Sequence, residues 1–187
     1  MNRIPMKSLA VVALMLSVRA AGAYANDEKV KMSYSGTAAS SAINLQQPNT
    51  TDDEDTFAGD GTLGAFTLRN VRAISNAPGA STTCSGSNKL FLTESAGAGV
   101  FRFKDGSLLE LTLTEGSDCI DLTTGIANCL VTFKITGGTG RFKNASGNLT
   151  MTETVSNVIS DTLGNPALSV GTGTITGEVH CVDKEEN

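Results

Sequence analysis

The sequence predicts a single all-β domain, an eight-stranded antiparallel barrel, and three features of the chain support this prediction. Beyond the first 25 residues, no long stretch places apolar residues at helical spacing. Short runs that alternate apolar and polar residues recur instead, and many contain threonine. Turn signals separate these runs, and the whole sequence contains 20 glycines. Because side chains alternate between the two faces of a strand, this pattern is typical of an antiparallel sheet.

The first 25 residues predict a cleaved signal peptide. Arg3 and Lys7 precede an apolar stretch, and the small residues that follow end in Ala23-Tyr24-Ala25. These are the three parts of a secretory signal. The apolar stretch is shorter than the roughly 18 residues that would cross a bilayer; a buried N-terminal helix of the domain is the alternative. We expect cleavage before Asn26, one domain over residues 26–187, no membrane span after cleavage, and export to a periplasm, cell surface or medium.

The charge balance argues against a polyanionic partner. The whole sequence has 14 basic and 19 acidic side chains and a formal net charge of −5. The predicted signal contains three of the basic residues and no acid, so its removal leaves the chain near −8. Nucleic-acid binding needs a basic face that displaces counterions from phosphate, whereas the cations here are scattered among more carboxylates. We therefore expect no nucleic-acid partner.

Four cysteines follow the predicted signal, and an even number in an exported chain indicates two disulfides. Of the three possible pairings we favour Cys119 with Cys129, which would close the loop 120–128, and Cys84 with Cys181. In the chain-entropy model the short loop would contribute about 3 kcal/mol and the long one about 4 to 5 kcal/mol. The sequence has no Cys-x-x-Cys spacing and a single histidine. We therefore expect no metal site and no cofactor.

Eight runs are predicted as strands. In the clearest, Leu109, Leu111 and Leu113 share one face, and the same alternation recurs around Phe133. Turn signals such as Asp60-Gly61 lie between the runs, so neighbouring strands should pair as hairpins. The predicted strands are Lys31–Thr37, Gly64–Ala73, Lys89–Glu94, Gly99–Lys104, Ser107–Thr114, Cys129–Thr136, Asn148–Val155 and Val170–Val182.

One acidic segment is predicted to be a solvated loop. Residues Gln46–Asp60 contain the run Asp52-Asp53-Glu54-Asp55 and few apolar side chains. A calcium site is the alternative, but the run lacks the alternating oxygen ligands and the central glycine of a known calcium loop.

Closure of the sheet into a barrel is favoured over a β-sandwich. Successive hairpins give an up-and-down order, and closure removes the exposed strand edges. The last predicted strand carries Gly171, Gly173 and Gly177, which suit close approach of side chains inside a barrel.

The run from Gly137 to Gly147, Gly-Gly-Thr-Gly-Arg-Phe-Lys-Asn-Ala-Ser-Gly, resembles a signature of the dirigent and allene oxide cyclase barrels. Adjacent glycines permit positive φ at a turn, and Phe142 can cap the core at a barrel end. The chain resembles still more a set of mostly uncharacterised bacterial exported proteins of that barrel type, through Gly61–Thr67, Lys104–Ser107 and Gly171–Gly177. The resemblance implies an eight-stranded barrel and homo-oligomers, dimers or trimers, as in the plant members.

Two residues are candidates for ligand binding, and no catalytic residue can be assigned. Strict alternation along Leu149, Met151 and Glu153 places the Glu153 carboxylate on the apolar face, where its pKa would be raised. Tyr34 is a second candidate for a side chain that points inward. The alternatives are that Glu153 has reached the wet barrel rim and that Tyr34 is a packing residue. His180 shares a face with threonines and should point to solvent.

Three functions remain open from the sequence. We rank a structural or interaction protein first, a barrel that binds a small apolar molecule second, and an isomerase or cyclase of the kind the resemblance implies third. A lumen filled by Leu109, Val131, Phe133 and similar side chains would favour the first. A cavity with converging polar groups would favour the other two.

Overall fold

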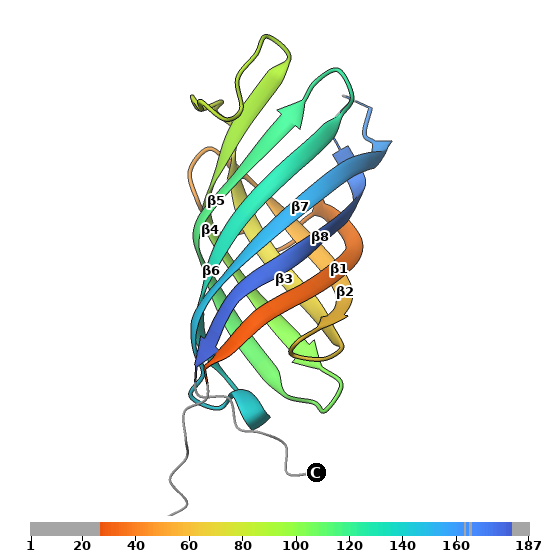
Figure 1. The fold of residues 1–187 in the computed structure, drawn as a ribbon. Helices are drawn as coiled ribbons and strands as arrows, with labels where there is room; N and C mark the ends of the chain where they lie inside the picture. The colour runs from red at the N-terminus through yellow and green to blue at the C-terminus, as the bar shows by residue number, and fades with distance from the viewer. Residues whose placement is uncertain (1–26, 163, 165, 181–187) are drawn as a thin grey trace, which may run out of the picture.

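The fold is a closed barrel of eight antiparallel strands (Figure 1). A computed structural model describes residues 27–162, 164 and 166–180. Each strand pairs with the next along the chain, and the last pairs with the first over twelve residue pairs from Glu28–Val179 to Ala39–Leu168. The strands are β1 (Glu28–Ser40), β2 (Thr50–Gly61), β3 (Phe66–Ser75), β4 (Lys89–Phe103), β5 (Leu108–Asp121), β6 (Ile126–Gly138), β7 (Ser146–Ser160) and β8 (Pro166–His180). The predicted barrel is confirmed, and the sandwich alternative is wrong.

The number of strands was predicted correctly, but two predicted elements were wrong. The acidic segment predicted as the loop Gln46–Asp60 forms most of β2, because Asp55 and Phe57 alternate inward while their neighbours face outward. The two predicted strands Lys89–Glu94 and Gly99–Lys104 form one strand, β4, which continues through a register shift opposite Ala73 and Ile74. The two errors cancel in the strand count.

One end of the barrel is closed by aromatic side chains. We call it the lower end, as in Figure 1; it carries the β2–β3, β4–β5 and β6–β7 connections and the 3-10 helix η1 (Gly140–Phe142). The ring of Phe103 lies 4.6 Å from that of Phe142 and 5.9 Å from that of Phe101, measured between centroids. The Arg141 guanidinium covers both Phe103 and Phe142, at 4.9 and 4.6 Å from their ring centroids. This end is therefore packed as a conventional apolar core.

The glycine-rich run forms the β6–β7 turn, and part of its predicted geometry is wrong. Gly137 and Gly138 are the last residues of β6 and do not have positive φ. The left-handed positions are Gly140, with φ of 60°, and Gly147, with φ of 132°. Phe142 is fully buried, so its predicted capping of the core is confirmed.

The favoured disulfide pairing is wrong. Cys84 bonds Cys119, at a sequence separation of 35, and Cys129 is a buried free thiol. The reason is the strand register: Cys129 lies opposite Asp118, whereas Cys119 lies opposite Asn128. Cys119 and Cys129 therefore face opposite sides of the sheet and cannot bond. Because Cys84 is bonded to Cys119, the predicted bond between Cys84 and Cys181 is wrong as well. Cys181 itself and the predicted signal peptide lie outside the described residues.

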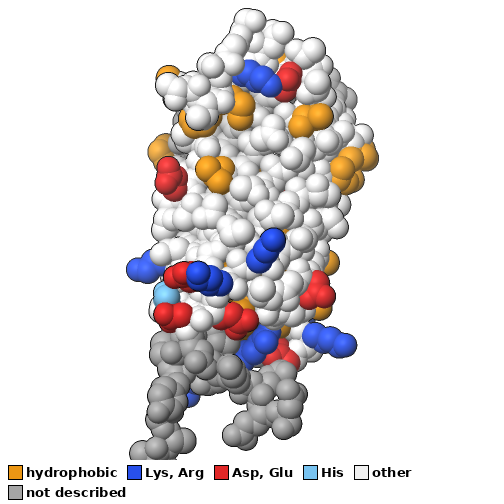
Figure 2. Space-filling view, in the orientation of Figure 1, with side chains coloured by type: hydrophobic (Ala, Val, Ile, Leu, Met, Phe, Trp, Pro, Cys, Tyr) orange, Lys and Arg blue, Asp and Glu red, His pale blue; other side chains and the backbone are white. Residues whose placement is uncertain are grey.

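The outer surface carries both signs of charge. Figure 2 shows acidic and basic side chains side by side near the lower end, and fewer over the middle of the same face. Several large apolar side chains are exposed on the outside, among them Leu130, Val158 and Val170. Within the described part of the chain, no helix is long and apolar enough to cross a membrane.

Candidate functional site

Charged side chains gather inside the barrel, toward the end opposite the aromatic residues. We call Asp55, Arg72, Glu94, Asp118 and Glu153 the lumen cluster. They come from five strands, β2, β3, β4, β5 and β7, and none is more than 6% exposed. Burial of this many charged groups is unusual in a small domain, since charged side chains are rarely buried unless paired.

The strand register explains why these side chains meet. Asp118 on β5 lies opposite Cys129 on β6, and Cys129 lies opposite Glu153 on β7. Glu153 in turn lies opposite Gly173 on β8, and Gly173 lies opposite Tyr34 on β1. These five positions form one continuous row around the inner wall. The structure thus brings together the two predicted ligand-binding residues, Glu153 and Tyr34, although their role in binding stays a prediction.

Arg72 is the cation of the cluster and bridges two strands. Its guanidinium nitrogens lie 2.9 Å from an oxygen of Asp55 and 2.5 Å from an oxygen of Glu94. Burial alone would lower the pKa of Arg72, but the carboxylates of Asp55 and Glu94 outweigh it and hold that pKa well above its usual value. Arg72 therefore stays charged at every physiological pH.

Burial makes the carboxyl groups of Glu153 and Glu94 harder to ionise. Burial raises the pKa of Glu153 to about 8, and the nearby carboxyl of Asp55 adds to the effect. Burial also raises the pKa of Glu94 to about 8, against the opposing charge of Arg72. Nearer the upper end of β2, burial raises the pKa of Asp53 to about 6. At neutral pH, Glu153, which forms no ion pair among the described residues, accordingly carries a proton in a large fraction of molecules.

Tyr34 and Cys129 border the cluster as neutral groups. The Tyr34 hydroxyl donates to the backbone carbonyl of Thr152 at 3.4 Å, and burial together with the charge of Glu153 raises its pKa. Burial and the carboxyl of Asp118 raise the pKa of the Cys129 thiol. A thiol held in its protonated form is a poor nucleophile, so the geometry does not support covalent catalysis through Cys129.

Three glycines make room for the cluster. A Cβ placed on Gly171 would collide with Glu153 Oε1, one on Gly173 with the Tyr34 hydroxyl, and one on Gly116 with Glu94 Oε2. The side chains of Glu153, Tyr34 and Glu94 therefore occupy space beside a neighbouring strand that a Cβ atom would otherwise fill. The predicted use of Gly171 and Gly173 for close approach inside the barrel is confirmed.

The cluster holds more hydrogen-bond acceptors than donors. Asn70 is 2% exposed; its side chain bonds Asp55, and its Oδ1 has no hydrogen-bond partner. Glu153 Oε1 also has none. The other buried cluster atoms without a hydrogen-bond partner are Arg72 Nε, Glu94 Oε2 and Asp118 Oδ1. Of these five atoms only Arg72 Nε is a fixed donor, and the carboxyl oxygens are acceptors when their groups ionise. Buried polar atoms in native proteins are nearly always satisfied.

The remaining predicted features lie outside this site. His180 lies on the outer side, where its Nδ1 is 2.6 Å from Asp27 Oδ1. The described residues contain no group of three or more histidine, cysteine or acidic side chains placed to hold a metal ion. Sequence reasoning missed Asp55, Arg72, Glu94 and Asp118; the alternation of Leu68, Asn70 and Arg72 was a signal for one of them.

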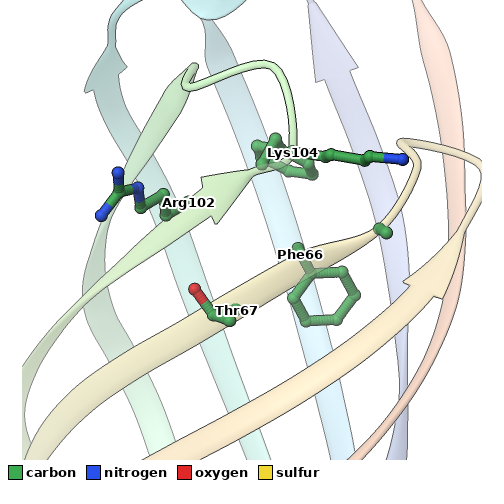
Figure 3. A pocket seen from close by; sticks show the side chains of 6 residues that line it. Phe66, Thr67, Arg102 and Lys104 are labelled. Atoms are coloured by element: carbon green, nitrogen blue, oxygen red, sulfur yellow. The ribbon is translucent and has the colours of Figure 1, made fainter.

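A depression lies on the surface at the lower end (Figure 3). Its volume is about 450 Å³, and its lining includes Phe66, Arg102 and Lys104. In Figure 3 the Arg102 and Lys104 side chains point away from each other. They do not converge on one point, so this depression offers less for recognition than the lumen cluster.

No family model and no curated protein matches the chain. Among solved structures, the chain is similar to that of a pterocarpan synthase dirigent protein, with 12% sequence identity and a TM-score of 0.39, over 87% of this chain and 89% of that chain. We take no function from this likeness. The assignment of a closed eight-stranded antiparallel barrel, the fold that the sequence resemblance implied, rests on the strand pairing described above.

Proposed function

We propose that the protein binds a small molecule in the upper half of its barrel, with the lumen cluster as the recognition site. The observation that carries this proposal is the convergence of buried, unpartnered acceptor oxygens from Asn70, Glu94 and Glu153 inside the barrel. A bound molecule with hydrogen-bond donors would satisfy them, and a few placed polar groups in an otherwise apolar interior are typical of ligand sites.

The energetic cost of the cluster supports binding over a purely structural role, which we ranked first from the sequence. Replacing buried ion pairs by well-packed apolar side chains is often neutral or stabilising. The lower end of the same barrel shows such packing, with Phe101, Phe133 and Phe142 fully buried. A barrel selected for stability alone would be expected to continue this packing upward.

The side chains above the cluster support access from the upper end. By alternation, the next inward positions toward that end on β3, β4, β5, β6 and β7 are all half-buried. These residues are Ile74, Leu92, Ile120, Ala127 and Val155. They would contact the apolar part of a ligand whose polar part reaches the cluster, so an amphipathic molecule fits better than the wholly apolar one predicted from the sequence.

We also propose that the protein is exported, as the N-terminal residues predict. The disulfide between Cys84 and Cys119 supports this compartment, because such bonds persist in oxidising environments. The predicted dimer or trimer remains a prediction.

Thermal-shift measurements with native mass spectrometry test the binding proposal. The probes are 2-phenylethylamine, catechol, glucose and decanoate, each added to the folded protein. We expect at least one to raise the melting temperature by more than about 2 °C in a saturable manner. The shift should be lost in Glu153→Gln and kept in Glu178→Gln, the same change on the exposed face of β8. No shift with any probe, or equal shifts in both variants, would restore the structural or interaction role.

A further inference from the structure

The charges inside the barrel do not balance. Among the described residues, the lumen cluster contains four carboxyl groups and one guanidinium. Arg72 engages Asp55 and Glu94, and within the described part of the chain no ion pair forms to Glu153 or Asp118. If every acid were ionised, the interior would carry an excess of negative charge in a region of low dielectric constant, which is strongly unfavourable.

The buried atoms without a hydrogen-bond partner show, independently of charge, that hydrogen-bond donors are missing from the site. Asn70 is neutral and 98% buried, and its unsatisfied atom is an acceptor, Oδ1. Glu153 Oε1 has no partner either, and it is an acceptor once the carboxyl ionises. With Glu153 ionised, the site lacks both positive charge and hydrogen-bond donors. A primary ammonium group supplies both, with three donors and one charge in a small volume.

We propose that the molecule bound in the barrel is a primary amine in its ammonium form, attached to an apolar body. This inference rests on the proposed binding function and names its ligand class. The ammonium would lie among Glu153, Asp118 and Asn70. The apolar body would extend toward the upper end along Ile120 and Val155. A bare metal ion fits less well, since the described acids and thiol are not grouped at metal-binding geometry.

Binding of such a cation would release protons. Groups from seven strands face Glu153: Tyr34, Asp55, Arg72, Glu94, Asp118 and Cys129 on β1 to β6, while β8 presents Gly171 and Gly173. Burial raises the pKa of Glu153 to about 8, so this carboxyl holds a proton below that pH. An ammonium favours the ionised carboxylate, so it must displace a proton at neutral pH. Affinity should therefore rise with pH up to about 8 and then level off.

Isothermal titration calorimetry with three probes of one shape tests this inference: 2-phenylethylammonium, neutral 2-phenylethanol and anionic phenylacetate. We expect 2-phenylethylammonium to bind tightest. Its affinity should be about tenfold higher at pH 7.5 than at pH 6.5 if one proton is displaced. Titrations in buffers of different ionisation enthalpy should show proton release. Equal affinity for the ammonium and the alcohol, or binding without proton release, would overturn the inference.

Variants separate the ligand class from the binding site. Glu153→Gln should weaken 2-phenylethylammonium at least tenfold at pH 8.5, and Asp118→Asn serves as a second variant should Glu153→Gln fold poorly. Glu178→Gln should bind as the wild type does. If 2-phenylethanol or phenylacetate binds best and Glu153→Gln weakens it, the site stands and the ammonium class is wrong. If none of these probes and none of the thermal-shift probes binds, the proposed function itself fails.

Discussion

Glu153 shows how one side chain depends on the absence of another. Its carboxyl lies over Gly171 on the neighbouring strand, where any Cβ would collide with Oε1. Gly171 does not have positive φ, so a glycine is needed here because it has no side chain, and not because of its backbone conformation. A glycine diagonally across from a buried acid, on the adjacent strand, is therefore a local device that admits a carboxyl to the barrel interior.

Gly171→Ala tests this device. We expect a loss of about 1 to 3 kcal/mol in the free energy of unfolding, because the added methyl group must displace the Glu153 carboxyl. The cost should shrink in a Glu153→Ala background, and a double-mutant cycle from denaturant unfolding would measure the coupling. Gly137→Ala is the matched control, since its nearest atom would lie at 3.5 Å, an ordinary contact. An equal cost with and without Glu153 would contradict the account.

At the scale of single strands, alternation predicted one half of the site and β-bulges hid the other half. On β7 the alternation of inward side chains runs from Leu149 through Met151 to Glu153 without interruption, so the sequence pattern predicted that Glu153 points inward. On β5 the inward positions Leu109, Leu111 and Leu113 are followed by a register shift between Leu113 and Glu115. Beyond the shift the inward positions are even-numbered, and Asp118 points into the lumen instead of outward.

Two further members of the site were hidden for related reasons. Glu94 lies beyond a register shift between β3 and β4. Asp55 belongs to an acidic run that is polar enough to suggest a solvated loop, and only the barrel interior shows that it alternates with Phe57. Bulges and buried charge depend on partner strands, so neither is visible in the periodicity of one segment.

The disulfide belongs to the same scale, because it ties the β3–β4 connection to the outer face of β5. Non-reducing peptide mapping by mass spectrometry should recover Cys84 linked to Cys119 and never Cys119 linked to Cys129. Cys84→Ser should destabilise the fold by about 4 kcal/mol in the chain-entropy model for a loop of this length. Recovery of a Cys119–Cys129 peptide would show that the β5–β6 register is different from the one described.

The two ends of the barrel differ in what they bury. The lower end is a packed aromatic core, whereas the upper half of the lumen buries charge that must be partly neutralised by protons. Glu94 and Glu153 have raised pKa values in the folded chain, so the folded state binds more protons than the unfolded state above pH 4.5. Their contribution to stability is therefore present at low pH and is lost as pH rises through about 8.

This division predicts the pH dependence of folding. The free energy of unfolding of the wild type should fall between pH 5 and pH 9. Glu153→Gln cannot ionise, so it should gain about 1 to 3 kcal/mol relative to the wild type over that range. Urea unfolding followed by circular dichroism would measure both, with Glu178→Gln as the control for loss of one surface charge. A constant difference between Glu153→Gln and wild type at all pH values would mean that Glu153 is not buried as an acid.

The most direct test of a charged, ligand-binding lumen is the titration of the Glu153 carboxyl carbon by ¹³C nuclear magnetic resonance, with and without 2-phenylethylammonium. The account predicts a pKa of about 8 in the free protein, caused by burial, and a fall of at least about one unit when the ammonium is bound. A midpoint near 4.5 that does not move on addition of the probe would contradict it.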